Sequence, residues 1–264
     1  MRESGGTVLV TGASSGIGEA LASVFAEHGH DLVLVARSAD KLEQLADQLV
    51  ADHGVVVAVR TVDLSKPRSA GKLADGLRRE GWEIDVLVNN AGVLQHGAFA
   101  EMSPGDHQRM IQLNVAGMTD LLACFLPDML ERGSGRILNV ASIASFLPVP
   151  SLATYAATKA YVLSLGEALA EELRGSGVTV TTLCPGVTDT HMMNDAMASS
   201  EGLKLPRMVI GDAESVARDG FRACMKGETV EVPGALNQAL TLTARNTPKW
   251  LLHRLTGLMG RSTF

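Results

Sequence analysis

The sequence has little cysteine, few aromatic residues and no long apolar run. Its three cysteines, Cys124, Cys184 and Cys224, form no CxxC motif and no Cys/His cluster, which argues against a disulfide framework or a structural zinc site and fits a reducing compartment. The net charge of −6 gives no attraction to nucleic acid or anionic membranes. No segment approaches the roughly 18–20 uninterrupted apolar residues of a membrane span, and the N-terminal MRESGGTVLV lacks the apolar region of a signal peptide. We therefore expect a cytoplasmic protein without a metal site.

What the sequence does contain is an alternation of β-branched runs with amphipathic stretches. The runs are almost continuously apolar, as strands buried on both faces of a sheet should be. Repeated strand–helix–strand units predict an α/β fold, a doubly wound and mostly parallel sheet of seven strands with helices on both faces. The runs cover residues 7–11, 31–36, 55–62, 84–89, 135–140, 178–184 and 228–232.

Helix start and stop signals support this pattern. Ser103, Pro104 and Asp106 follow one another as an N-cap, a first helical residue and an acid in the first turn. Gly54 and Gly175 stand where helices should end.

The stretch VLVTGASSGIG ends the first predicted strand in glycine. A strand, a glycine turn and a helix can bring backbone N–H groups and a helix N-terminus to a pyrophosphate. Gly12 would allow the tight turn, Gly16 the close approach of a dinucleotide, and Gly18 close packing of the helix on the strand. The alternative is a glycine-rich turn without a ligand. The candidate cofactor-binding residues here are Gly12, Ser14, Ser15, Gly16, Ile17 and Gly18.

Further motifs follow in a fixed order. After TGASSGIG come NNAG (89–92), Asn114, Ser142, YAATK (155–159) and PG (185–186). Together they resemble the short-chain dehydrogenase/reductase family, including bacterial ketoreductases, from residue 7 to about 233. The resemblance implies a single Rossmann-type dinucleotide-binding and catalytic domain over residues 1–233, and a homodimer or homotetramer formed through the helices in 107–131 and 154–174.

The end of the second strand bears on the choice of cofactor. In dinucleotide folds an acid there binds the ribose of NAD, whereas a base accommodates the 2′-phosphate of NADP. Ala36 stands at the acid's position and Arg37 follows it, so we expect NADP(H) to be favoured over NAD(H). Ser15, where many NADP-binding relatives have a second base, weakens this preference. The alternative for Arg37 is a solvated surface arginine.

The resemblance implies further cofactor contacts after the third, fourth and sixth strands. Asp63 would bind the adenine amino group with Leu64 beside the ring, although an Asp that caps the next turn is an equal alternative. Asn90 is expected to stabilise the sheet. The remaining implied contacts are Asn89, Ala91 and Gly92 around the ribose, and Pro185, Gly186, Val187, Thr188 and Thr190 beside the nicotinamide and diphosphate.

Tyr155 and Lys159 are four residues apart in a predicted helix and therefore share one face. A tyrosine with its ordinary pKa of about 10 is a poor base at neutral pH. A lysine ammonium one turn away favours the phenolate, so the spacing predicts a general acid/base. By the resemblance, Lys159 also binds the nicotinamide ribose. Tyr161 has no lysine four residues later, and we interpret it as a packing residue.

Two more residues complete the candidate catalytic set. By the resemblance, Ser142 holds the substrate oxygen and steadies developing negative charge; Ser145 lies off the family position. Asn114 is a polar residue in an apolar helical stretch. A satisfied buried amide is one interpretation of Asn114, and a water-mediated proton relay from Lys159, implied by the family, is the one we favour. The candidate catalytic residues are Asn114, Ser142, Tyr155 and Lys159.

The substrate side is expected to be apolar. Met192, Met193 and Met197 lie in a segment that forms a lid in the family, and FLPVPSL (146–152) would line the other side. Residues 234–264 form a C-terminal extension, expected to pack on the same domain, over its substrate cleft, or on a partner subunit; a membrane-surface helix is the alternative.

These observations predict an NADP(H)-dependent oxidoreductase that interconverts a small to medium apolar ketone or aldehyde with an alcohol. The complete Asn–Ser–Tyr–Lys set argues against the main alternative, a catalytically silent NADP-binding sensor. An NAD-dependent alcohol dehydrogenase, or a dehydratase or epimerase of the same fold, remains a further alternative.

Overall fold

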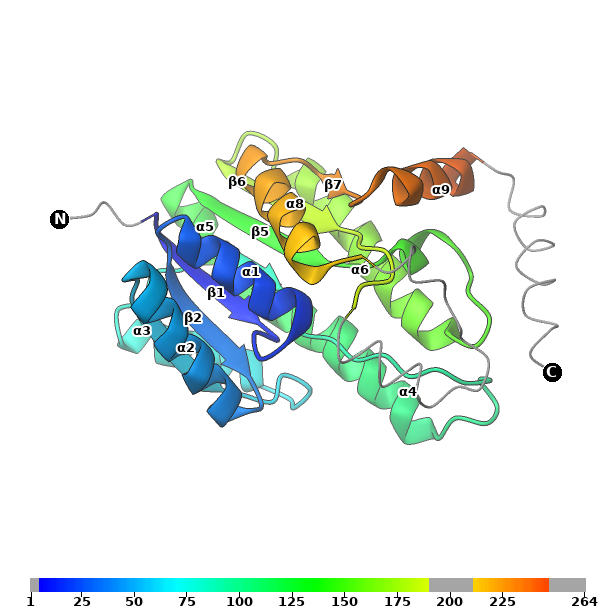
Figure 1. Ribbon diagram of the computed structural model, residues 1–264, viewed down its shortest axis with the longest axis horizontal. Coiled ribbons are helices and arrows are strands. Elements are labelled where there is room, and N and C mark those ends of the chain that lie inside the picture. The colour runs from blue at the N-terminus through cyan, green and yellow to red at the C-terminus, as the bar shows by residue number, and fades with distance from the viewer. Residues whose placement is uncertain (1–4, 190–210, 247–264) are drawn as a thin grey trace.

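The computed structural model describes residues 5–189 and 211–246, with side chains to residue 243. One sheet of seven parallel strands forms its centre, in the order β3-β2-β1-β4-β5-β6-β7 (Figure 1). The predicted α/β, doubly wound fold is therefore confirmed. The strands are β1 (Thr7–Thr11), β2 (Asp31–Ala36), β3 (Val57–Thr61), β4 (Val86–Asn89), β5 (Gly135–Val140), β6 (Val178–Leu183) and β7 (Val230–Glu231).

Four strands are shorter than the apolar runs that predict them. β3, β4, β6 and β7 each lose residues at one or both ends. Ile84 shows the reason, because it is 4% exposed and packs in the core although it precedes β4. Apolar patterning reports burial, and burial continues into the connections beyond the hydrogen-bonded ladder.

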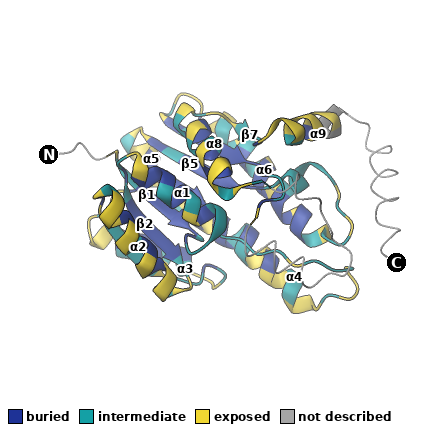
Figure 2. Ribbon diagram, viewed as in Figure 1, coloured by how far each residue is buried: buried dark blue, intermediate teal, exposed yellow. Residues whose placement is uncertain are grey.

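Helices cover both faces of the sheet. On one face lie α1 (Gly16–Glu27), α2 (Ala39–His53) and α8 (Ala213–Lys226), which Figure 1 shows in front of the strands. The other face carries α3 (Ser69–Arg79), α5 (Met118–Arg132) and α6 (Ala153–Glu172). The central strands are buried from both sides, while the outer helix faces are exposed (Figure 2). This burial explains why the strand sequences are continuously apolar rather than alternating.

The predicted helix signals have the expected geometry at two sites. Ser103 caps α4 (Pro104–Ile111), and its hydroxyl accepts a hydrogen bond from the backbone N–H of Asp106 at 3.2 Å. Gly54 ends α2 in the left-handed conformation, with φ of 68°. Gly175 also has a positive φ, but it lies beyond the last residue of α6.

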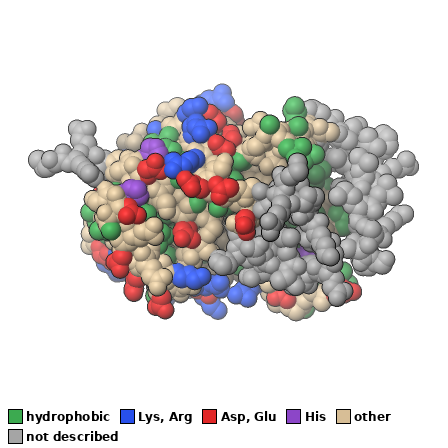
Figure 3. Space-filling model, viewed as in Figure 1, with side chains coloured by type: hydrophobic (Ala, Val, Ile, Leu, Met, Phe, Trp, Pro, Cys, Tyr) green, Lys and Arg blue, Asp and Glu red, His purple; other side chains and the backbone are tan. Residues whose placement is uncertain are grey.

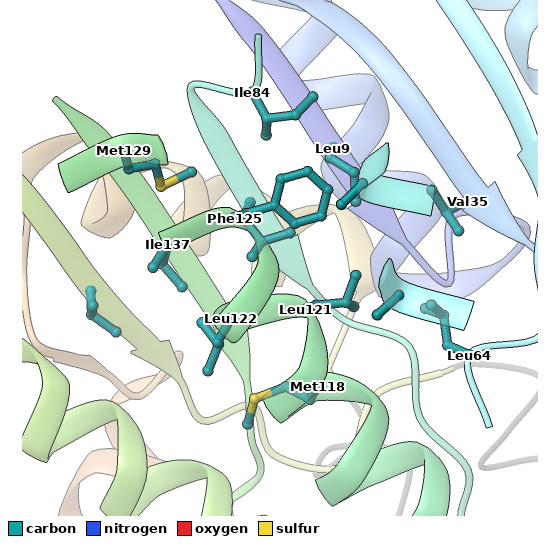
Figure 4. Close-up of a cluster of buried hydrophobic side chains, with 14 of the residues drawn as sticks. Leu9, Val35, Leu64, Ile84, Met118, Leu121, Leu122, Phe125, Met129 and Ile137 are labelled. Carbon is teal, nitrogen blue, oxygen red and sulfur yellow. The ribbon is translucent and has the colours of Figure 1, made fainter. Parts of the chain in front are cut away.

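α4 continues through a π-helical turn, η1 (Gln112–Gly117), into α5, so that Pro104–Arg132 is one long helix. By length and composition alone this helix could cross a membrane, although its apolar residues do not form an uninterrupted run. Its inner side chains pack instead against the sheet, where Leu121 and Phe125 lie beside Leu9 and Ile137 (Figure 4). This packing is that of a core helix in a globular domain.

A row of polar side chains crosses the sheet one level beyond this core. Asn89 on β4 is paired with Asn139 on β5, and Asn139 with Thr182 on β6. Thr11 occupies the corresponding last position of β1. All four residues are at most 5% exposed. The row lies at the carboxyl end of the sheet, where Thr11 and Asn89 are the last residues of β1 and β4.

Candidate active site

A cavity of about 510 Å³ opens at the carboxyl ends of the strands, where the strand order reverses between β1 and β4. This is the position at which doubly wound sheets bind their ligands. Most of the site residues predicted from the sequence line it. They are Gly12, Ser14, Ser15, Gly16, Ile17, Arg37, Asp63, Leu64, Ala91, Gly92, Ser142, Tyr155, Lys159, Pro185, Gly186, Val187 and Thr188.

Three of the predicted residues that the structure describes do not line the cavity. Gly18 and Asn114 are not among its lining residues, and Asn89 is buried in the polar row, where its amide donates to Asn139 Oδ1 at 2.9 Å. Thr190 lies outside the described residues, as do Met192, Met193, Met197 and the extension from residue 247 onward.

The glycine turn is held in place by Asn90. Its side-chain amide donates to the carbonyl oxygens of Thr11 and Gly12, at 2.9 and 3.3 Å. Gly12 has a φ of 67°, and a Cβ there would lie 2.8 Å from the Asn90 amide nitrogen. A Cβ on Gly18 would overlap both that nitrogen and the carbonyl oxygen of Gly12. The close contact among Gly12, Gly18 and the Asn90 side chain therefore requires glycine at positions 12 and 18.

The turn fits the pyrophosphate of a dinucleotide. α1 begins directly behind it at Gly16, and the N-cap Ser15 uses no side-chain hydrogen bond to close the first turn. The backbone N–H groups at this helix start can therefore face an anion in the cavity. Glycines at the approach surface leave room for such a ligand, so these residues fit the cofactor that the motif predicts.

Arg37 and Asp63 lie at one end of the cavity. Arg37 is exposed at the end of β2. Asp63 Oδ1 accepts hydrogen bonds from the hydroxyl and the backbone N–H of Ser65, at 2.6 and 3.0 Å. The Ser65 hydrogen bonds, helped by the positive charge of Arg37, lower the pKa of Asp63. Asp63 therefore caps the following turn and also lines the cavity, while its contact with the adenine amino group stays a prediction.

Tyr155 and Lys159 occupy one face of α6, and both are buried. The Lys159 ammonium donates to the carbonyl oxygen of Val140 at 2.8 Å and lies 5.9 Å from the centre of the Tyr155 ring. Burial raises the pKa of Tyr155 to about 12, partly opposed by a hydrogen bond with Ser142. Burial also lowers the pKa of Lys159 to about 8. In the protein alone, burial thus outweighs the lowering of the Tyr155 pKa that the spacing predicts.

Ser142 is positioned by the start of η2 (Ile143–Phe146), a short 3-10 helix. It is the N-cap of this helix, and its hydroxyl accepts from the backbone N–H of Ala144 at 3.1 Å. The same hydroxyl faces Tyr155 and acts to lower the pKa of its phenol. Ser145 does not line the cavity. Ser142 is therefore the serine of this segment that meets Tyr155.

Asn114 lies in the π-helical turn and is 2% exposed. Its amide exchanges two hydrogen bonds with the backbone of Val93, both at 2.9 Å, and donates to the Thr158 hydroxyl at 3.1 Å. These contacts are those of a satisfied buried amide. They join η1 to α6 and to the loop after β4, and the proton relay remains a prediction.

Several residues near the site were not singled out from the sequence. Thr158, the partner of Asn114, carries no motif signal, and Leu240 and Thr241 line the cavity from α9 (Ala235–Asn246), far along the chain. Tyr161 is 38% exposed, and its hydroxyl lies 3.0 Å from that of Thr119, so it is more than a packing residue. Within residues 5–189 and 211–246, no cluster of His, Cys, Asp or Glu could hold a metal ion.

Comparison with known proteins agrees with this geometry. The family model of the short chain dehydrogenases matches residues 6–201. Oxidoreductase UcpA of Escherichia coli is 38% identical over 189 residues, 71% of each chain. Ketoacyl reductase HetN of Nostoc is 35% identical over 230 residues, 86% of this chain and 78% of HetN. A short-chain dehydrogenase from Sphingobium yanoikuyae, solved with NADPH, has a TM-score of 0.80 at 33% identity, covering 92% of this chain and 97% of its own. The chain therefore belongs to the short-chain dehydrogenase/reductase family and is an NAD(P)-dependent oxidoreductase.

Proposed function

We propose that this protein interconverts an apolar ketone or aldehyde and the corresponding alcohol, uses NADP(H) in preference to NAD(H), and employs Tyr155 as the general acid/base. The observation that carries the proposal is the meeting of Tyr155, Ser142 and Lys159 in one cavity whose other end holds the glycine turn and Arg37. The NADPH complex of the Sphingobium relative and the ketoacyl reductase name of the Nostoc relative support both the cofactor and the carbonyl substrate.

The cofactor would be held by this chain's own groups along the whole cavity. The backbone N–H groups at the start of α1 bind the pyrophosphate. Arg37 binds the 2′-phosphate of the adenosine ribose, to which a guanidinium can donate two hydrogen bonds. Lys159, held by Val140, binds at the nicotinamide end. When bound, the nicotinamide supplies or accepts the hydride.

Tyr155 moves the proton of the reaction. In reduction its hydroxyl donates a proton to the substrate oxygen, and in oxidation it takes the proton back. Because burial raises its pKa to about 12, Tyr155 is protonated at neutral pH, which is the form required for reduction. Ser142 holds the same oxygen and stabilises the negative charge that develops on it. Lys159 is largely charged at neutral pH despite its lowered pKa and stabilises negative charge in the same region.

The test compares the two cofactors and the two tyrosines. NADPH and NADH are titrated into the purified protein to measure their Kd values. Oxidation of each cofactor is then measured with a panel of aldehydes and ketones as substrates. We expect tighter binding of NADPH and turnover that falls by about two to four orders of magnitude in Tyr155→Phe. Tyr161→Phe, on the same helix and outside the cavity, is the matched control and should retain turnover.

Three other results would contradict the proposed function. Tighter binding of NADH would favour an NAD-dependent alcohol dehydrogenase. NADPH binding with no turnover on any carbonyl would favour a sensor, and turnover that survives Tyr155→Phe would overturn the assigned acid/base.

We also propose a homo-oligomer formed through the long helix and α6. Ile111, Leu130 and Tyr161 are large side chains of these elements that are 37–41% exposed in the single chain. Analytical ultracentrifugation of the purified protein tests this, and a monomer at micromolar concentration would overturn it.

A further inference from the structure

Tyr155 lies in the first turn of α6, and this turn has no side-chain cap. α6 begins at Ala153, and its N-cap is Leu152, which offers the helix start no side-chain hydrogen bond. The first backbone N–H groups of a helix have no partner within the helix, so an uncapped first turn is not held in place by the helix itself. The position of the Tyr155 hydroxyl therefore depends on contacts that reach this turn from other elements.

His107 on α4 supplies such a contact. Its Nδ1 lies 2.8 Å from the hydroxyl of Thr154, the residue before Tyr155, and its Nε2 lies 3.1 Å from the carbonyl oxygen of Phe99. A carbonyl can only accept, so Nε2 carries a proton, and Nδ1 of the neutral ring accepts the proton of the Thr154 hydroxyl. The ring also packs against that of Phe99, with centroids 4.2 Å apart. His107 thus joins the start of α6 to the loop between β4 and α4.

The same loop holds the approach to α6 at a second point. The Gly97 N–H donates to the carbonyl oxygen of Ser151 at 2.9 Å, and Ser151 has a φ of 62°. The Leu152 N–H donates to the carbonyl oxygen of Val149 at 3.2 Å, which closes a turn with Pro150 second and Ser151 third. A positive φ at the third position of such a turn favours glycine, so a serine there requires support from its surroundings.

The His107 link acts at a distance from the cavity and is directional. His107, Thr154 and Phe99 are not among the residues that line the cavity, so they can influence the reaction only through α6. Elsewhere an ion pair joins two helices, as between Arg218 of α8 and Glu27 of α1 at 2.9 Å, and Figure 3 shows charged side chains of both signs over these helices. Exposed ion pairs fix geometry weakly, whereas a hydrogen bond between a ring nitrogen and a hydroxyl requires a defined direction.

We propose that His107 is a positioning residue for Tyr155 and fixes the first turn of α6 through the Thr154 hydroxyl. This inference rests on the proposed function, in which Tyr155 is the general acid/base. Proton transfer requires the tyrosine hydroxyl to lie within hydrogen-bond reach of the substrate oxygen. A displacement of about 1 Å can lower the rate about a hundredfold. Loss of the link should therefore lower kcat, while the glycine turn and Arg37 continue to bind the cofactor.

The same pair of helices provides a matched control. Thr119 of α5, in the long helix that begins with α4, has its hydroxyl 3.0 Å from that of Tyr161 on α6. This contact also joins the long helix to α6, but it lies beyond Tyr155 and away from the helix start. A general loosening of the two helices would appear in variants of either contact, whereas an effect on Tyr155 would appear only at His107 and Thr154.

The first experiment measures kcat, and the KM of NADPH, with a carbonyl that the wild type reduces. In His107→Asn the amide oxygen lies near the position of Nδ1 and can accept from Thr154, whereas the longer side chain of His107→Gln reaches the position of Nε2 instead. We expect kcat to fall about ten- to hundredfold in His107→Gln and in the nearly isosteric Thr154→Val. His107→Asn, Thr154→Ser and Thr119→Val should stay within about threefold of the wild type, and the KM of NADPH within about twofold in all variants.

Three outcomes of this experiment would overturn the positioning role. Equal losses in His107→Asn and His107→Gln would assign the effect to the packing of the ring on Phe99. A loss in Thr119→Val as large as that in Thr154→Val would show a general effect of loosening the two helices. Unchanged kcat in His107→Gln and Thr154→Val, with only a lower free energy of unfolding in urea, would show that His107 serves the fold alone.

The second experiment does not depend on turnover. The chain has two tyrosines, so Tyr155 is the only tyrosine in a Tyr161→Phe background. Isotope labelling of the tyrosine ring carbon that bears the hydroxyl then gives one NMR signal, which reports on the Tyr155 hydroxyl with and without NADPH. The signal should shift or broaden in His107→Gln and Thr154→Val and remain in place in His107→Asn.

This signal separates the positioning role from the proposed reaction. A shift in His107→Gln and Thr154→Val, in a protein that turns over no carbonyl, would contradict the proposed function and leave the positioning of Tyr155 by His107 standing. An unchanged signal in both variants, with or without turnover, would overturn the positioning role.

Discussion

Asn90 at the end of β4 is hydrogen-bonded to both peptide carbonyls that flank Gly12, the glycine at the end of β1. Both bonds reach across the point where the strand order reverses, so one side chain fixes the shape of the cofactor turn from a neighbouring strand. Thr11 acts from the other side, since its hydroxyl accepts from the backbone N–H groups of Asn90 and Ala91, both at 3.0 Å.

Asn90→Ala should weaken cofactor binding without removing any group that is proposed to touch the cofactor. Two part-buried carbonyl hydrogen bonds are lost, which costs about 1–3 kcal/mol of turn stability. We expect the Kd of NADPH, measured by fluorescence titration, to rise about tenfold. An unchanged Kd together with a lower free energy of unfolding would show that Asn90 serves only the fold.

Arg37→Ala should discriminate between the two cofactors. If Arg37 binds the 2′-phosphate, its loss removes charge-assisted hydrogen bonds that NADH never makes, so the Kd of NADPH should rise about tenfold or more while that of NADH stays constant. Arg174→Ala, an exposed arginine paired with Glu171 at the end of α6, is the control. Equal weakening of both cofactors would contradict the assignment.

Two helix glycines should respond to alanine in opposite directions. A Cβ on Gly71 in α3 meets nothing within 4 Å, so Gly71→Ala should stabilise the protein by about 0.5–1 kcal/mol through a lower backbone entropy of the unfolded chain. A Cβ on Gly166 in α6 would overlap the Thr182 hydroxyl, and Gly166→Ala should cost about 1–3 kcal/mol.

Urea denaturation of the single and double variants measures both effects. Because the overlap involves the Thr182 oxygen, Gly166→Ala should be less damaging in a Thr182→Ala background than in the wild type. Additive losses would refute the contact as the cause.

His30 should make stability depend on pH below neutrality. It is 4% exposed and packs edge-on against Phe25, and burial lowers its pKa from the usual value of about 6.5. As the pH falls below that value, His30 is protonated in the unfolded chain but not yet in the folded protein. The free energy of unfolding therefore falls until the pH reaches the lowered pKa of His30 in the folded protein.

His30→Phe should remove this loss. Between pH 7.5 and 5, the unfolding free energy of the wild type should fall relative to that of the variant, by at most about 1.4 kcal/mol per pH unit. Parallel curves over this range would exclude His30 as the titrating group.

The sequence was sufficient to predict the strands, the glycine turn and the Tyr155–Lys159 pair, because each depends on local periodicity or spacing. A position of the C-terminal extension over the cleft was among the expectations, but Leu240 and Thr241 could not be singled out, since they reach the cavity only through the packing of a distant helix on η2. The pKa of Tyr155 in the protein without its cofactor could not be predicted for a related reason. The spacing reveals the neighbouring charge, whereas the burial that dominates depends on the whole fold.

The polar row across the sheet limits which amino-acid substitutions related sequences can accumulate at these positions. Asn89 and Asn139 each depend on a partner on the adjacent strand, and Thr182 is matched to the missing side chain of Gly166. A single replacement would leave a buried donor or acceptor unmet or create an overlap, at a cost of about 1–3 kcal/mol. Substitutions in the row should therefore become fixed as pairs across lineages, Asn89 with Asn139 and Thr182 with Gly166, while the apolar positions below them drift independently.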